Sequence, residues 1–433
     1  MSYLLINGGK KLKGSIKVQT AKNSAVAILC ASILVKGKVE LNDVPQIEEV
    51  NRIIELLKSI GVKISGDGGR LIIDSSGLLD LQKIDKTAVA KTRSSLLLLG
   101  ALAGRLKKYK LARSGGCKLG NRTVRPHIFA LEKLGLKINS RPDCYEVDAS
   151  GLTAGKIVMY ESGDTPTENA IMAAVAAKGT TVIKMASANY MVADLCIFLQ
   201  SVGAEISGVG TTTLTVVGGQ SMATGVKYAI MPDPIVCMTL MATAIVTGSR
   251  LTIKNCPMEY LELELCKLEV MGQKFKIKNK RLSANNFFQL ADIEIIPSKL
   301  TALPDKIEGR PFPGLNIDNL PLFVPILAKA QGRTLVHDWA YENRAVYSLE
   351  LQRLGVNVTL LDPHRIWVEG PTKFKHNEVI APPALRPAVN VFICMLAAKG
   401  QSILRNTYEI DRGYENLYAV LNSVGADVQV ISK

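Results

Sequence analysis

Cys117 is the side chain of this 433-residue sequence whose surroundings most favour reactive chemistry. It follows Gly115 and Gly116 and is followed by the cations Lys118 and Arg122. Nearby positive charge favours the thiolate, which is the reactive form of cysteine. Because glycines allow unusual backbone angles, we expect a flexible loop that exposes Cys117 as an acid and covalent group.

The cations of the whole chain indicate an anionic partner. The 53 lysines and arginines exceed the 38 aspartates and glutamates by 15. Such an excess is typical of proteins that meet nucleic acid, a membrane surface or phosphorylated small molecules. Arg93 follows an expected loop and is expected to open a helix, whose N-terminal amides would help to hold an anion.

The absence of several sequence motifs excludes some of these classes of partner. The basic clusters at 107–110 and 274–281 carry no run of interleaved aromatic residues on which bases could stack, so we expect no nucleic-acid partner. No apolar run approaches the ~18–20 residues of a membrane span, and the N-terminus lacks the order of a signal peptide. The four histidines lack ligand spacing, and no glycine-rich nucleotide motif stands between a strand and a helix. We therefore predict a cytoplasmic protein without metal or cofactor, and its scattered cysteines fit a reducing compartment.

The elements that must position these side chains recur about every seventy residues. An amphipathic stretch ends in a glycine and is followed by alternating residues at Gly61, Gly135, Gly203, Gly272, Gly355 and Gly425. In the first stretch, Val50, Ile53, Ile54 and Leu57 have the spacing of an apolar helical stripe. A glycine after a helix suits a left-handed C-cap, and the alternation predicts a half-buried strand. The pattern therefore predicts six αβ units.

The second unit is longer than the others. In that unit 31 residues separate Gly104 from Gly135, whereas 23 to 25 residues separate the equivalent glycines elsewhere. About seven extra residues therefore lie around 111–122, the segment that contains Cys117. Function is often carried by such insertions, because the scaffold does not need them.

Five motifs carry a resemblance to a known family. They are Ala21-Lys-Asn23, Gly115-Gly-Cys117 with Arg122, Thr167-Glu-Asn169, Glu342-Asn-Arg344 and Ile410-Asp-Arg-Gly413. With these motifs the chain resembles the enolpyruvyl transferases along essentially its whole length, and their nucleotide-sugar branch is the closer match. The resemblance implies an α/β (α+β) fold, a two-domain inside-out α/β barrel with three αβ units per domain. A catalytic-loop domain would span 21–229 and a second domain 1–20 plus 230–433, with the active site in the cleft between them.

The resemblance also implies roles for individual residues. Members of the family move the enolpyruvyl group of phosphoenolpyruvate onto an acceptor hydroxyl and release phosphate. The implied catalytic residues are Cys117, Asp318, Lys22 and Arg412. The implied substrate-binding residues are Asn23, Arg93, Arg122, Arg386 and Arg344. Arginine suits these places because its planar fork pairs with carboxylate and phosphate.

The assignment of Asp318 as the base rests on a count. The family pattern is Phe-Pro-Thr-Asp, whereas this chain reads Phe312-Pro-Gly-Leu-Asn-Ile-Asp318. Read without a gap, the aspartate's place falls on Leu315. Counting back fourteen residues from Gly332 instead reaches Asp318. We therefore infer an insertion of three residues and expect Asp318 to take the hydroxyl proton.

The resemblance implies UDP-N-acetylglucosamine as acceptor, at its 3-hydroxyl, in the first committed step of peptidoglycan synthesis. The acceptor-contacting segments nevertheless depart from the family pattern: they read Thr123-Val-Arg125, Gly163-Asp-Thr165, Asp233-Pro-Ile-Val236 and Ala188-Asn-Tyr-Met191. Two alternatives therefore stay open. One is an enolpyruvyl transferase acting on a different nucleotide or sugar-phosphate acceptor, and the other is an anion-binding homologue with weak catalysis. The sequence specifies no oligomeric state.

Overall fold

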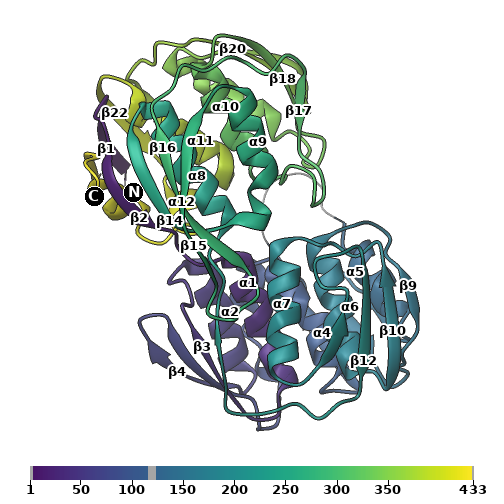
Figure 1. The fold of residues 1–433 in the computed structure, drawn as a ribbon. Coiled ribbons are helices and arrows are strands. Elements are labelled where there is room, and N and C mark those ends of the chain that lie inside the picture. The colour runs from purple at the N-terminus through teal and green to yellow at the C-terminus, as the bar shows by residue number, and fades with distance from the viewer. Residues whose placement is uncertain (1–2, 116–122, 432–433) are drawn as a thin grey trace. The chain divides into compact units, whose positions relative to one another are not determined.

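The computed structural model describes residues 3–115 and 123–431 of the chain. These residues form two compact units (Figure 1). In the described part, unit 1 comprises residues 3–19 and 232–431, and unit 2 comprises residues 20–115 and 123–231. The chain passes between the units after Gln19 and after Met231, close to the expected boundaries after residues 20 and 229.

Unit 2 contains three sheets among its described residues. One has the strand order β13 (Val226–Ala229), β3 (Lys38–Asn42), β5 (Arg70–Asp74), β4 (Lys63–Asp67). A second has the order β6 (Lys108–Ala112), β8 (Cys144–Asp148), β7 (Lys137–Ser140). The third has the order β11 (Glu205–Ser207), β12 (Thr213–Gly218), β10 (Gly179–Lys184), β9 (Lys156–Val158).

The helices of unit 2 pack on one another as well as on the sheets. They are α1 (Lys22–Ala31), α2 (Glu48–Ser59), α3 (Lys86–Lys91), α4 (Leu98–Ala103), α5 (Arg125–Glu132), α6 (Asp164–Ala176) and α7 (Tyr190–Ser201). α6 lies against α4, α5 and α7, and α1 lies against α7. Residues 166–175 of α6 are all buried. Such a helix has neighbours on every side, so it forms the core of the unit.

Unit 1 also has three sheets in the described residues. Their strand orders are β21 (Glu378–Ile380), β22 (Gly400–Arg405), β1 (Tyr3–Gly8), β23 (Val428–Ile431); then β15 (Lys274–Leu282), β16 (Gln289–Ile296), β14 (Arg250–Pro257), β2 (Lys13–Lys17); and β17 (Lys306–Glu308), β18 (Gly332–His337), β20 (Arg365–Gly370), β19 (Asn357–Asp362). The first strands of the chain thus complete sheets built from its second half.

The helices of unit 1 surround one that is wholly buried. They are α8 (Pro234–Thr247), α9 (Glu262–Val270), α10 (Leu320–Lys329), α11 (Leu385–Ala397), α12 (Tyr408–Asp411) and α13 (Leu417–Asn422), with a 3₁₀ helix at Ala345–Leu354. Every residue of α8 is buried, and α10 and α11 both pack against it. The core of this unit therefore lies along α8 (Figure 1).

The four-stranded sheets share one plan. Each has a parallel pair at one edge and two antiparallel pairs beyond it, as β9, β10, β12 and β11 show. In the described residues, the sheet of β6, β8 and β7 has the antiparallel pairs without the parallel edge strand. That sheet lies in the second of the six αβ units expected from the sequence, the one that is longer than the others.

All six glycines expected to end helices have positive φ angles, between 85° and 103°. The predicted stripe in α2 is mostly correct: Val50, Ile53 and Leu57 are buried, but Leu56 takes the buried place expected for Ile54. The helix before Gly355 forms with 3₁₀ rather than α geometry. Gly104 has a right-handed φ, and a Cβ there would lie 2.7 Å from the Cβ of Ala176. Close packing, rather than chain reversal, therefore requires that glycine.

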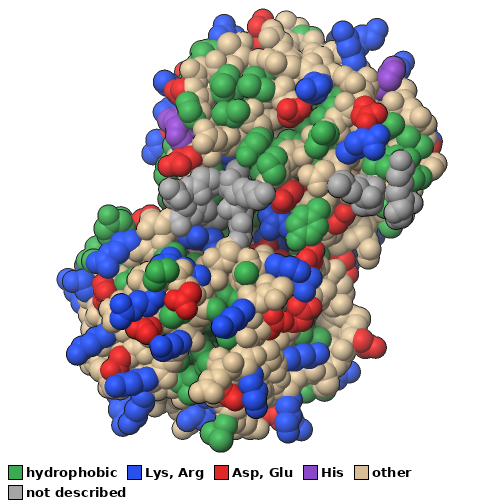
Figure 2. Space-filling view, turned by 180° about the vertical axis from the view of Figure 1, so that it is seen from behind, with side chains coloured by type: hydrophobic (Ala, Val, Ile, Leu, Met, Phe, Trp, Pro, Cys, Tyr) green, Lys and Arg blue, Asp and Glu red, His purple; other side chains and the backbone are tan. Residues whose placement is uncertain are grey.

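The basic clusters are solvated and partly neutralised. Lys110 lies 2.9 Å from Glu146, and Lys278 lies 2.6 Å from Glu294 across neighbouring strands. On the face in Figure 2, lysines and arginines are scattered among acidic and apolar side chains. No helix in the described ranges is long and apolar enough to cross a membrane.

Candidate active site

Two of the predicted site residues, Cys117 and Arg122, lie outside the described residues, as does most of the extra segment of the second unit. The remaining seven are described. Lys22, Asn23 and Arg93 belong to unit 2, whereas Asp318, Arg344, Arg386 and Arg412 belong to unit 1.

Lys22 begins α1 and forms an ion pair with Glu49. Its Nζ lies 2.8 Å from Oε2 of Glu49, and fewer than a fifth of either side chain is exposed. The other oxygen of Glu49 accepts a hydrogen bond from Oγ of Ser94 at 3.0 Å. The backbone before Lys22 is held because the amide of Ala21 donates to the carbonyl oxygen of Met231. Lys22 therefore has a defined position and an acidic neighbour.

Asn23 contacts the first residue of α7. Its Nδ2 donates to the hydroxyl of Tyr190 at 3.1 Å, and Tyr190 is buried. Tyr190 belongs to the segment Ala188-Asn-Tyr-Met191, which departs from the family pattern. The amide of Asn23 is therefore oriented by a residue particular to this departure.

Arg93 stands before a short 3₁₀ helix, Ser94–Leu97, rather than the α-helix that its sequence context suggested. Its Nη2 donates to the carbonyl oxygen of Thr123 at 2.9 Å. The side chain is half-buried. Its bond to Thr123 turns the guanidinium toward the segment that directly follows residue 122.

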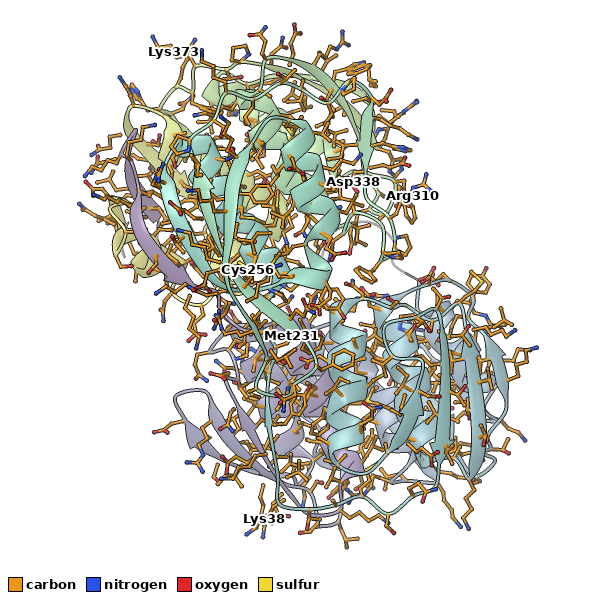
Figure 3. The ribbon with its side chains drawn as sticks, in the orientation of Figure 1. Lys38, Met231, Cys256, Arg310, Asp338 and Lys373 are labelled. Atoms are coloured by element: carbon orange, nitrogen blue, oxygen red, sulfur yellow. The ribbon has the colours of Figure 1, made fainter. Side chains whose placement is uncertain are left out.

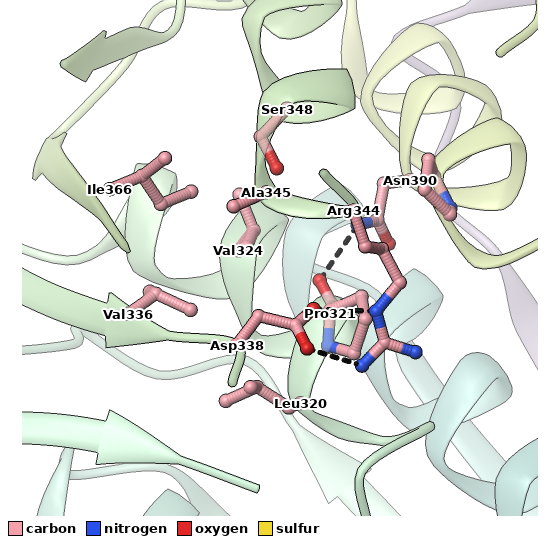
Figure 4. Close-up of a pocket in the computed structure, with 11 residues that line it drawn as sticks. Leu320, Pro321, Val324, Val336, Asp338, Arg344, Ala345, Ser348, Ile366 and Asn390 are labelled. Atoms are coloured by element: carbon pink, nitrogen blue, oxygen red, sulfur yellow. Dashed lines mark hydrogen bonds and ion pairs between the residues drawn. The ribbon is translucent and has the colours of Figure 1, made fainter. Parts of the chain in front are cut away.

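Asp318 lies beside the buried arginine Arg344. Nη1 of Arg344 is 3.2 Å from Oδ1 of Asp318, and 27% of the Asp318 side chain is exposed. Nε and Nη2 of Arg344 bond the two carboxylate oxygens of Asp338, the second at 2.9 Å (Figure 4). Nη2 also donates to the backbone oxygen of Ile317. Arg344 and Asp338 are 2% and 5% exposed, so one guanidinium is shared inside the protein by two carboxylates.

The loop that carries Asp318 is anchored to α9 by Glu264. Oε1 of Glu264 accepts a hydrogen bond from Nδ2 of Asn319 at 2.7 Å, and the amide of Asn316 lies 3.4 Å from the same oxygen. The side chain of Asn316 in turn accepts the amide of Asp318 at 2.9 Å. Burial raises the pKa of Glu264, and its bond from Asn319 opposes that rise. Residues 316–319 therefore form a turn that is held by hydrogen bonds.

Arg386 approaches Asp318 from α11. Its Nη2 lies 3.8 Å from Oδ2 of Asp318, while Nη1 donates to the hydroxyl of Tyr414 at 2.6 Å. The Tyr414 hydroxyl also lies 2.8 Å from Oγ1 of Thr239 on α8. The positive charges of Arg344 and Arg386 thus balance the negative charges of Asp318 and Asp338.

Arg412 follows α12 and pairs within its own turn. Its Nε donates to Oε2 of Glu409 at 2.6 Å, and 19% of its side chain is exposed. The helix is also held because Oγ1 of Thr407 donates to Asp411. Arg412 is therefore not brought into contact with Asp318 or Arg344 by any of these bonds.

The acceptor-related segments contain an unexpected carboxylate. Asp164 is the first residue of α6, and it accepts hydrogen bonds from Oγ of Ser187 at 2.6 Å and from Nδ2 of Asn189 at 3.3 Å. Arg125, the first residue of α5, pairs with Glu132 at 3.2 Å. Asp233 caps α8 by accepting the amide of Ile235. Two of these three side chains thus serve local helix structure.

A small cavity lies beside the Arg344–Asp338 pair. Asn390, Ser348 and several apolar residues line it with that pair (Figure 4). Its volume is about 10 Å³, which is room for about one water molecule rather than a substrate. In residues 3–115 and 123–431, no group of histidine, cysteine, aspartate or glutamate side chains could hold a metal ion.

Three residues of this site were missed by the sequence reasoning: Glu49, Glu264 and Asp338. Glu264 had a readable signal, because it shares with Leu261, Leu265 and Leu268 the spacing of an apolar stripe. Asp338 and Glu49 carry no local signal, since their partners are 6 and 27 residues away in the chain.

Comparison with known proteins gives consistent relatives. A family model described as EPSP synthase (3-phosphoshikimate 1-carboxyvinyltransferase) matches residues 6–421. UDP-N-acetylglucosamine 1-carboxyvinyltransferase 2 of Caldanaerobacter subterraneus subsp. tengcongensis is 33% identical over 428 residues, 99% of either chain. UDP-N-acetylglucosamine 1-carboxyvinyltransferase of Lawsonia intracellularis is 34% identical over 429 residues, again 99% of either chain.

Solved structures share the fold. The enolpyruvyl transferase NikO from Streptomyces tendae has a TM-score of 0.86 and 22% identity, over 100% of this chain and 99% of that one. EPSP synthase from Acinetobacter baumannii has a TM-score of 0.77 and 18% identity over 100% of both chains. At these identities the likeness speaks for the fold alone, which is the mixed α/β fold of these transferases.

Proposed function

The chain belongs to the EPSP synthase family of carboxyvinyl transferases, and we propose that it transfers the enolpyruvyl group of phosphoenolpyruvate to UDP-N-acetylglucosamine. The acceptor would react at its 3-hydroxyl, and phosphate would be released, as the first committed step of peptidoglycan synthesis. The full-length relatives named for this reaction support the proposal, at about a third identity.

The proposed chemistry is an addition followed by an elimination. Cys117 donates a proton to the vinyl carbon of phosphoenolpyruvate, while the acceptor oxygen bonds the neighbouring carbon and gives its proton to Asp318. The Cys117 thiolate then takes a proton back from the new methyl group while the carbon–oxygen bond to phosphate breaks. This restores the double bond, and the phosphate leaves with the proton that Asp318 had taken up. Arg93, Arg122, Arg412 and Lys22 hold the carboxylate and phosphate, because paired cations stabilise charge that shifts during both steps.

One observation carries the assignment of the base. The Asp318 carboxylate is partly exposed, yet its position is determined by Arg344 on one side and Arg386 on the other. A general base needs such a fixed orientation with an open face for the reacting hydroxyl. We assign Arg386 and Asn23 to substrate binding.

The fold supports a finer proposal about its architecture. The five four-stranded sheets share one plan of parallel and antiparallel pairs, and six glycines end their units in the left-handed conformation. We propose that the chain is an inside-out α/β barrel protein of six repeated units, three in each domain, with the catalytic-loop domain at 21–229.

A second candidate, transfer to a different acceptor, is favoured by Asp164. Its carboxylate stands in the segment that, by resemblance, would hold the diphosphate of the nucleotide sugar. A like charge at hydrogen-bonding distance opposes a diphosphate. The alternative acceptor would be a nucleotide or sugar phosphate that places no diphosphate at this position.

Release of phosphate from phosphoenolpyruvate tests both candidates. The assay should use UDP-N-acetylglucosamine, a nucleoside monophosphate and shikimate 3-phosphate in parallel, with native protein and the variants Cys117→Ser and Asp318→Asn. Asp427→Asn, which alters an exposed pair with Lys10, is the matched control. Turnover with the nucleotide sugar that both site variants abolish is the expected result. Turnover with another acceptor alone would support the second candidate. Binding of phosphoenolpyruvate without turnover would leave only an anion-binding homologue.

A further inference from the structure

We propose that Asp338 is a positioning residue for the reaction, acting through Arg344 on Asp318. The inference rests on the proposed function, in which Asp318 takes the acceptor proton. It changes the expected role of Arg344 from binding substrate to orienting the base.

The geometry of Arg344 carries the first step. Its Nε and Nη2 form a two-pronged contact with Asp338, which leaves Nη1 directed at Asp318. A planar guanidinium cannot rotate one prong without moving the others. Asp338 therefore fixes the orientation of the Arg344 guanidinium, and the guanidinium in turn orients the carboxylate of Asp318.

The backbone of Asp338 is itself immobilised. It directly follows β18, whose His337 pairs with Glu308 of β17. Figure 3 shows Asp338 beside Arg310 where these two strands end. The amide of Asp338 donates to the carbonyl oxygen of His364 at 2.7 Å, and Nδ1 of His364 lies 2.9 Å from the carbonyl oxygen of Asp338. The end of an inner strand of this sheet thus holds the carboxylate that orients Arg344.

The Arg344–Asp338 pair is shielded from solvent. Arg344 is 2% exposed, and its ring neighbour Tyr341 lies 4.3 Å from its guanidinium carbon. The cavity that the pair lines has room for about one water molecule. A substrate anion would have to displace Asp338 or Asp318 to pair with this guanidinium, and removing a partner from a buried charge is costly.

Asp338 also moderates the charge that Asp318 meets. The groups that face Asp338 are Arg344, Asp318 and His364, and Arg386 faces Asp318 from α11. Burial raises the pKa of Asp338, with a further rise from Asp318 that Arg344 opposes. Arg344 is shared by both carboxylates, so removing the charge of Asp338 would leave that guanidinium to Asp318 alone.

The test compares Asp338→Asn and Asp338→Glu with native protein, using the acceptor that supports turnover. For Asp338→Asn we expect kcat to fall by about 10- to 100-fold, because misplacement by about 1 Å can cost that much. KM for phosphoenolpyruvate should stay within about threefold. The acidic limb of the kcat–pH profile should move to lower pH, since Arg344 then pairs with Asp318 alone. Asp427→Asn should change none of these values.

Each result has one reading. Asp338→Asn with kcat within twofold of native and an unmoved pH limb would overturn the inference. If this variant does not fold, Asp338→Glu decides, because it keeps the charge but displaces the guanidinium. A lower kcat with an unmoved limb would support the inference, and native kcat would overturn it. Full activity of Asp318→Asn would instead overturn the assigned base, and the proposed function with it.

Discussion

The ammonium of Lys22 lies 2.8 Å from Oε2 of Glu49, and fewer than a fifth of either side chain is exposed. The cation expected to meet phosphoenolpyruvate is thus already paired with an anion. Glu49 therefore competes with any anionic substrate for Lys22.

Replacing Glu49 should strengthen phosphoenolpyruvate binding. In Glu49→Gln we expect KM for phosphoenolpyruvate to fall by about two- to fivefold, which corresponds to the modest energy of a partly exposed pair. Steady-state kinetics at low salt measure this, since salt screens the effect. Glu55→Gln is the control, because Glu55 lies on the same helix and pairs with Arg52 away from Lys22. An unchanged or higher KM in Glu49→Gln would contradict the prediction.

Removing the Glu264 anchor should loosen the base loop. Glu264→Ala leaves Asn319 without its acceptor in a buried place, so the free energy of unfolding should fall by about 1–3 kcal/mol. Because Asn316 and Asp318 belong to the same bonded turn, kcat should fall as well. Denaturant unfolding and phosphate release measure the two effects. Glu262→Ala, an exposed residue of the same helix, should change neither. Native kcat in a folded Glu264→Ala protein would show that the anchor does not reach Asp318.

Stability should depend on pH through Asp194 of α7. Burial raises the pKa of Asp194 to about 6, against hydrogen bonds from Tyr228 and from the amide of Met231. The folded state then binds more protons than the unfolded chain between about pH 4 and 6, so the free energy of unfolding falls as pH rises through this window.

Urea unfolding of native protein and of Asp194→Asn between pH 4 and pH 7 tests this sign. The midpoint for native protein should decline over the window by more than the midpoint for Asp194→Asn. Parallel midpoints in the two proteins would refute the contribution of Asp194. Asp148→Asn is the control, because hydrogen bonds from Ser150 lower the pKa of Asp148 and outweigh the smaller rise from burial.

The charge of Asp164 should distinguish acceptors. Asp164→Asn keeps an oxygen that can accept from Ser187 while it removes the negative charge. If the acceptor carries a diphosphate here, KM for UDP-N-acetylglucosamine should fall by about fivefold, the scale of about 1 kcal/mol. KM for phosphoenolpyruvate should stay unchanged. An unaltered KM for the nucleotide sugar would indicate that its diphosphate does not approach Asp164.

The periodic features of the fold were predictable from the sequence. The glycines Gly61, Gly203 and Gly425 adopt the left-handed conformation expected of helix ends. Such local signals succeed because a C-cap depends on the backbone of a few neighbouring residues. The exchange of Ile54 for Leu56 on the buried face of α2 was not predictable in this way, because neighbouring elements select the face.

The site was predictable only where a motif named its residues. Motifs pointed to Lys22, Asn23 and Arg93, but they could not show that Glu49, Tyr190 and Thr123 would contact them. These partners lie 27, 167 and 30 residues away in the chain. Only a folded chain brings such distant groups within bonding distance.

The sequence by itself determined the excess of cations, and it predicted repeated αβ units and residue types that suit phosphoenolpyruvate chemistry. These features follow from local periodicity and composition, which need no knowledge of contacts. Tertiary structure alone decided that Arg344 is buried between two aspartates and that Glu264 holds the loop of Asp318. The physical reason is that burial and pairing of a charge depend on residues far away in the chain. Part of the excess of cations that first indicated an anionic partner thus lies on the solvated surface, and Arg344 is paired with carboxylates of the protein itself.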